Sequence, residues 1–217
     1  MDSAEAEAFE ERVHQTLESI RNHDEIKVDE AYFGMAPSVH PSYLERDERS
    51  AELIEVLSEN FPLFGRLSLA WHADEGAGGE TEMPDFDTIS DPANRYDDAS
   101  IERTFGGPAV VIDHHPRAGD HHLILIDLSS DLGELWVYNG NYGDPSRLSV
   151  DFETYQEAML DFRAGYGWEW LFSDPGACPW EDGIRSQLQS LVSSTQTLFG
   201  VDLEPYAARL ELWDIDK

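Results

Sequence analysis

Apolar residues recur at helical spacing in four stretches of the chain, which predicts four helices with one apolar face each. These stretches cover residues 3–22, 49–59, 151–162 and 181–199. In the first of them, Phe9, Val13 and Leu17 stand in an otherwise acidic and polar run. The polar positions should face solvent, so each helix is expected to dock its apolar face on one common core.

The stretch over residues 150–172 carries its own start and stop signals. Asp151 is expected to cap a helix by accepting hydrogen bonds from the amides of the first turn. Gly165 is expected to end that helix in a left-handed conformation, and Gly167 adds a second flexible point. The bulky side chains that follow are expected to fill the core, namely Trp168, Trp170, Leu171 and Phe172.

Strand patterns occupy the middle of the chain. Residues 67–71 alternate between apolar and polar positions, and three further strands are expected over residues 109–113, 122–128 and 134–139. The run over residues 122–128 is almost continuously apolar, as in a strand that is covered on both faces. We therefore predict an α+β fold: a single domain with a mixed or mainly antiparallel sheet flanked by helices, with N- and C-terminal helical additions.

Two segments lack these patterns. Residues 24–46 are expected to form turns around Pro37 and Pro41. Residues 72–107 are rich in glycine, proline and acids, which is typical of an irregular insertion. Such an insertion is either a solvated loop or a surface that binds a partner. The candidate partner-binding residues are Asp74, Glu75, Glu80, Glu82, Asp85, Asp87, Asp97 and Asp98.

Charge is the extreme feature of the composition. The 217 residues include 45 acidic and 14 basic ones, which gives a formal net charge of -31. Such a charge disfavours binding to nucleic acid or to an anionic membrane, and it favours a basic protein partner. An acidic surface adapted to high salt is the alternative. The lone Cys178 excludes an internal disulfide, and without a signal peptide or membrane span we expect a cytoplasmic protein.

One cluster could carry catalysis. Four histidines, His114, His115, His121 and His122, flank a predicted hairpin together with the carboxylates of Asp113 and Asp120. Such groups can bind zinc or iron, but neighbouring residues of a strand point to opposite faces, so at most about two of the imidazoles can converge. No further ligand is fixed by spacing. We expect no catalytic residue, metal or cofactor, with a metal-dependent hydrolase built on this hairpin as the alternative.

The segment over residues 109–172 resembles the SUKH superfamily, which includes fungal cell-wall synthesis regulators and bacterial immunity proteins. The resemblance is carried by Asp-Phe-Glu-Thr-Tyr at residues 151–155 and Gly-Tyr-Gly-Trp-Glu-Trp-Leu-Phe at residues 165–172. Here Asp151 and Thr154 replace the commoner Ser and Glu. The resemblance implies an α+β domain whose core covers about residues 50–172, with the acidic insertion at about 72–107 and a C-terminal helical extension over 181–213.

The resemblance also implies binding rather than catalysis. Together with the charge, it leads us to expect a non-enzymatic protein-binding module. Its expected role is that of a cytoplasmic immunity protein that neutralises a basic, nuclease-type toxin through an acidic surface. Two alternatives stay open: the metal-dependent hydrolase, and a regulatory scaffold with a salt-adapted acidic surface.

Overall fold

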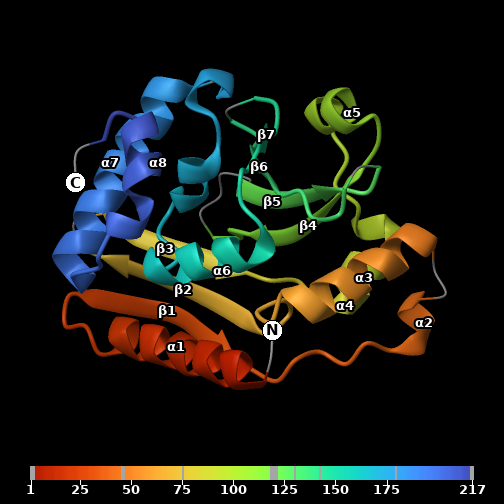
Figure 1. Cartoon of the computed structure of the whole chain (residues 1–217), viewed down its shortest axis with the longest axis horizontal. Helices are drawn as coiled ribbons and strands as arrows, with labels where there is room; N and C mark the ends of the chain where they lie inside the picture. Colours follow the sequence, from red (N-terminus) through yellow and green to blue (C-terminus); the bar gives the residue numbers. More distant parts are fainter. Residues whose placement is uncertain are drawn as a thin grey trace.

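The computed structural model describes residues 3–44, 47–74, 76–117, 122–129, 131–141, 143–178 and 180–215. Within these residues, seven strands form one open sheet in which every strand pairs antiparallel with the next one in sequence (Figure 1). The strands are β1 (Ile26–Phe33), β2 (Leu67–Ala73), β3 (Gly78–Glu82), β4 (Ala109–His114), β5 (His122–Asp127), β6 (Trp136–Asn139) and β7 (Ser146–Arg147). The predicted α+β class with a mainly antiparallel sheet is confirmed.

Helices precede, interrupt and follow the sheet. The α-helices are α1 (Ser3–Arg21), α2 (Pro41–Leu44), α3 (Glu48–Asn60), α4 (Phe86–Ser90), α5 (Ala99–Phe105), α6 (Phe152–Asp161), α7 (Glu181–Phe199) and α8 (Ala207–Leu212). Short 3-10 helices are η1 (Pro92–Asn94), η2 (Trp168–Phe172), η3 (Pro175–Ala177) and η4 (Glu204–Tyr206). The four helices predicted from apolar spacing correspond to α1, α3, α6 and α7.

The core is divided by the sheet into a large and a small part. Helices α1, α3, α4, α6, α7 and α8 contribute to the large cluster on one face, and α5 covers the small cluster on the other. Strand β5 contributes to both parts: Ile124 and Ile126 belong to the large cluster, and Leu125 to the small one. The prediction that this strand is covered on both faces is confirmed.

Three strands lie where none was predicted, and the shortest of them, β7, pairs with β6 at one edge of the sheet. Strand β1 falls in the segment expected to form turns, and it pairs only with β2 at the edge of the sheet. Strand β3 contains no large apolar residue, yet it lies between β2 and β4 near the middle of the sheet. The expectation that residues 72–107 form an irregular insertion is therefore wrong, because this segment supplies β3, α4 and α5.

The cap of α6 is as predicted, but the end of the helix is not. Asp151 accepts a hydrogen bond from the Thr154 amide at 2.8 Å, and this bond lowers the pKa of Asp151. The left-handed positions after α6 are Arg163 and Ala164, with φ of 56° and 51°, and not Gly165. The expected glycine cap at Gly165 is wrong, because the chain turns two residues earlier.

The turn after α6 is bonded directly to the unpredicted strand β3. The Glu80 amide donates to the Ala164 carbonyl at 2.8 Å, and the Tyr166 amide donates to the Gly78 carbonyl at 3.0 Å. A Cβ on Gly79 would lie 2.5 Å from the Ala164 carbonyl oxygen and 2.5 Å from Trp71 Nε1. The glycines of β3 therefore let the turn lie against the sheet, which places η2 over the β4–β5 hairpin.

Replacing Gly79 with alanine tests this close approach. We expect Gly79→Ala to lower the free energy of unfolding by about 1–3 kcal/mol, because the backbone of the turn must move away from β3. Gly107→Ala is the control, since a Cβ there meets nothing within 4 Å, and its effect should stay within about 0.5 kcal/mol. Urea unfolding of the three proteins measures the difference, and equal effects of the two substitutions would contradict the packing described.

Candidate functional site

Three buried polar side chains meet where the β4–β5 hairpin contacts η2. His115 follows β4, His122 begins β5, and Glu169 lies on η2. The Nε2 atom of His115 lies 3.2 Å from Glu169 Oε1, and the Nε2 atom of His122 lies 3.3 Å from Glu169 Oε2. Each of the three side chains is at most 2% exposed. Their ligand atoms all lie within 4.8 Å of one another, which is a spacing that could hold a metal ion.

Pairing of β4 with β5 brings the two histidines together. The His115 amide donates to the His122 carbonyl at 3.2 Å, so the two residues are neighbours across the hairpin. Their imidazole rings stack at 4.5 Å between centroids with an angle of 8°. Tyr166 contacts the ring of His115, and Trp170 contacts that of His122. Residues 165–172 therefore enclose both imidazoles.

Electrostatics keep Glu169 ionised. Burial alone would raise the pKa of its carboxyl, but the positive charges that His122 and His115 carry when protonated outweigh burial, so the pKa lies well below the usual range. Neither carboxylate oxygen has a hydrogen-bond partner within the part of the chain that the structure describes. Glu169 is thus a buried carboxylate whose charge is offset by imidazole nitrogens alone.

A second buried carboxyl lies beside this cluster. A bulge in β4 between Val111 and Asp113 turns the Asp113 side chain toward α6. Asp113 accepts hydrogen bonds from the hydroxyls of Thr81 and Tyr155, both at 2.7 Å. Burial raises its pKa, and the charges of His115 and Glu169 also act on it. Asp113 therefore belongs to the same electrostatic unit but is held by its own donors.

The predicted histidine cluster separates in the structure. His115 and His122 converge, whereas the Nδ1 atom of His114 lies 2.9 Å from the Glu82 carbonyl oxygen on the neighbouring strand. Asp120 and His121 lie outside the described residues. This separation follows the alternation of side chains along a strand. The sequence analysis did not identify Glu169. The one sign in the sequence was an acidic residue between two tryptophans in a segment that was expected to lie in the core.

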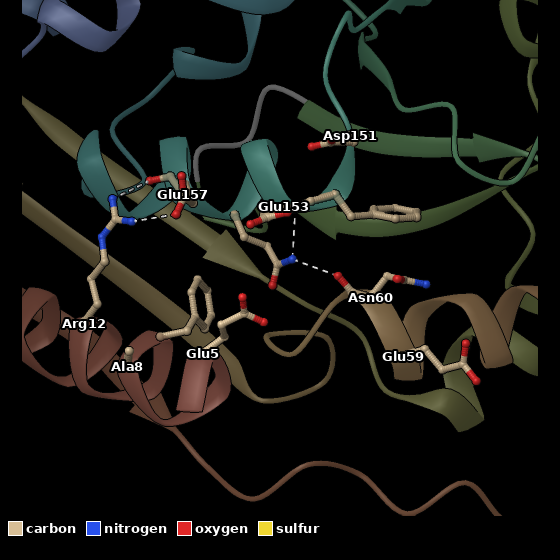
Figure 2. A pocket seen from close by; sticks show the side chains of 11 residues that line it. Glu5, Ala8, Arg12, Glu59, Asn60, Asp151, Glu153 and Glu157 are labelled. Carbon is tan, nitrogen blue, oxygen red and sulfur yellow. Dashed lines mark hydrogen bonds and ion pairs between the residues drawn. The ribbon is translucent and has the colours of Figure 1, made fainter. Parts of the chain in front are cut away.

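A second candidate site is a surface cleft between α1, the end of α3 and the start of α6 (Figure 2). Its volume is about 570 Å³. Phe9, Ala8 and Phe152 supply apolar atoms to its wall. The carboxylates that line it are those of Glu5, Glu59, Asp151, Glu153 and Glu157.

The same cleft contains one cation, and that cation is bound by acids. Arg12 on α1 contacts Glu157 at 3.1 Å and Asp161 at 2.7 Å, both on α6. Gln156, which is buried at the back of the cleft, donates to the carbonyls of Asn60 and Phe152 at 3.1 and 3.0 Å. The walls are thus fixed by polar contacts, and the remaining charge of the lining is negative.

The acids predicted to bind a partner do not share one environment. Asp74, Asp87 and Asp97 are exposed. Asp85 and Asp98 cap α4 and α5 by accepting hydrogen bonds from backbone amides. Glu82 is half-buried, and Glu75 lies outside the described residues.

Glu80 requires a correction. It is 1% exposed and accepts a hydrogen bond from the Arg117 amide at 2.8 Å. Because the Glu80 side chain is buried, it cannot belong to an exposed binding surface. The segment over residues 72–107 offers scattered acids, whereas the cleft gathers them.

Comparisons of the chain with protein-family models, with curated proteins and with solved structures found no match. Among the helices of the described residues, none combines the length and the apolar character that crossing a membrane requires. The resemblance to the SUKH superfamily therefore stays a prediction from the residues that carry it.

Replacing Glu169 with glutamine tests the buried charge. In chelator-containing buffer at pH 7 we expect Glu169→Gln to lower the free energy of unfolding by about 3 kcal/mol, as when one partner of a buried ion pair is lost. Because the folded-state pKa lies below the ordinary value of 4.5, this stabilisation is complete above about pH 4.5 and is lost as the pH falls further.

Urea unfolding between pH 3 and pH 7 measures that pH dependence. Glu211→Gln, on an exposed position of α8, is the matched control and should change stability by less than about 0.5 kcal/mol. A difference between wild type and Glu169→Gln that stays constant across the whole pH range would show that the carboxylate charge is not what stabilises the fold.

Proposed function

We propose that this protein is a non-enzymatic binding module of the SUKH type that captures a basic protein partner in the acidic cleft between α1, α3 and α6. The observation that carries the proposal is the gathering of five carboxylates around an apolar wall in a chain of net charge -31. The resemblance of residues 109–172 to immunity proteins supports a toxin as that partner.

Charge and shape of the cleft select the chemistry of the partner. A lysine or arginine side chain has an apolar stem and a cationic head. Phe9 and Phe152 suit the stem, and Glu59 and Glu153 are exposed carboxylates that suit the head. An arginine can bind a carboxylate through two parallel hydrogen bonds. The cleft therefore fits a basic loop or helix end of a partner protein.

The net charge of the chain acts at longer range. A negative surface raises the rate at which a positive partner is encountered. The same surface repels nucleic acid, so the chain does not itself bind the substrate of a nuclease-type toxin. An inhibitor of such a toxin therefore gains both speed and selectivity from acidity. The buried His115, His122 and Glu169 give no support to a hydrolase, because a substrate has no access to side chains that are at most 2% exposed.

Expression beside the product of the neighbouring reading frame tests the function. We expect the chain to co-purify with that protein and to rescue cells from its toxicity. A failure of both would overturn the antidote role. Unfolding at low and high salt tests the salt-adapted scaffold in parallel, since that alternative predicts a chain that unfolds as salt is removed.

Neutralising acids of the cleft tests where the partner binds. We expect Glu59→Gln/Glu153→Gln to slow association by about three- to tenfold at low salt, because part of the steering charge is removed. Asp87→Asn/Glu211→Gln removes the same charge elsewhere on the surface and should slow association less than about twofold.

Stopped-flow or surface-plasmon association rates measure the two effects. The difference between the two variants should shrink between about 0.05 M and 0.5 M salt as the charges are screened. Equal rates for the two double variants at low salt would place the interface outside the cleft while leaving the binding function itself intact.

A further inference from the structure

The cluster of His115, His122 and Glu169 has the chemistry of a metal site. Two imidazole nitrogens and one carboxylate oxygen form a common protein ligand set for zinc and related divalent transition metals. A tetrahedral zinc ion at about 2.0–2.2 Å from its ligands holds those ligand atoms about 3.3 Å apart. In this structure each imidazole nitrogen faces a different oxygen of the carboxylate, His115 Nε2 at 3.2 Å from Oε1 and His122 Nε2 at 3.3 Å from Oε2. One ligand atom from each of the three residues lies within 4.8 Å of the others.

Charge within the cluster points the same way. Glu169 is fully buried, and Asp113 lies within electrostatic reach of it. Protons on both imidazoles would place two like charges face to face at 4.5 Å. A divalent cation bound by neutral imidazoles offsets the carboxylates without that repulsion.

Neither oxygen of Glu169 is hydrogen-bonded by a described residue, although the carboxylate is wholly buried. Buried carboxylates in proteins are normally satisfied by donors or by a cation. The described groups that contact these oxygens are the imidazole nitrogens of His115 and His122, and a cation shared with those nitrogens would satisfy the carboxylate.

We infer that His115, His122 and Glu169 bind one divalent transition-metal ion, with zinc as the best match, and that this ion fastens η2 to the β4–β5 hairpin. Burial of all three ligands denies a substrate access to the ion, which makes the role structural, and a small ligand such as water would complete the tetrahedral set of four. One imidazole must rotate about its Cβ–Cγ bond when the ion binds, because a metal lies close to the plane of each ring that it binds and the two rings are stacked. The inference is independent of the proposed partner.

Metal analysis of the full chain tests the inference. After treatment with a chelator and exposure to Zn²⁺, the wild-type protein should retain about one zinc per chain and unfold at a higher temperature than the metal-free form. Replacement of zinc by Co²⁺ should give the strong visible absorption of a tetrahedral site. We expect Glu169→Gln and His122→Gln each to weaken zinc binding by at least about 100-fold, the upper end of what loss of an outer-shell group costs.

His114→Gln is the matched control, because His114 neighbours His115 in sequence but contacts Glu82 instead. It should bind zinc like the wild type. The near-isosteric glutamine variants keep the volume of the site, and circular dichroism shows whether each one folds. Wild-type protein that retains no stoichiometric zinc or Co²⁺, or a folded Glu169→Gln variant that binds either metal as tightly as the control, would overturn the inference.

Discussion

The position of η2 on the sheet depends on one buried carboxylate. Moving an ion of that kind out of water costs several kcal/mol unless opposite charge replaces the solvent. Glu169 finds that charge at His115 and His122, which the pairing of β4 with β5 places side by side. The helix η2 can therefore dock only where the hairpin is correctly formed.

Other features of the fold follow from this docking. The left-handed turn at Arg163 and Ala164 reverses the chain after α6, and the glycines of β3 let that turn approach the sheet. Trp168, Trp170 and Phe172 then enter the large core on either side of Glu169. Residues 150–172, predicted as a capped helix followed by bulky core residues, therefore serve as a scaffold. The cleft that we propose for binding lies at the start of α6, at the opposite end of the helix from this turn.

Most arginines of this chain are paired with acids of the same chain, while much of the negative charge faces solvent. Eight arginines form ion pairs with acids among the described residues: Arg12, Arg49, Arg66, Arg95, Arg103, Arg117, Arg147 and Arg185. In each pair at least one partner is partly exposed to solvent, and such pairs add little stability. Acids that do not take part in these pairs, such as Glu59 and Glu153 at the cleft, contribute to the field that an approaching partner meets.

Periodicity was a sufficient guide where apolar side chains decide the structure. It predicted α1, α3, α6 and α7, the cap at Asp151 and the doubly covered β5. Periodicity did not predict β3, because the position of this strand depends on the close contact of Gly79 with Ala164 and Trp71. The helix stop predicted at Gly165 was wrong for the same reason, since contacts with β3 set the geometry of the turn. Strand alternation predicted that at most about two of the four imidazoles converge, and the structure shows that these two are His115 and His122. The role of Glu169 could not be predicted from the sequence, because it arises only when η2 packs against the β4–β5 hairpin.

Hydrogen–deuterium exchange of the chain, free and bound to the basic protein partner that we propose, tests the central claim most directly. The account predicts that exchange slows at the start of α1, the end of α3 and the first turn of α6, which surround the cleft. Slowing confined to α5 and β7, with the cleft unchanged, would contradict it.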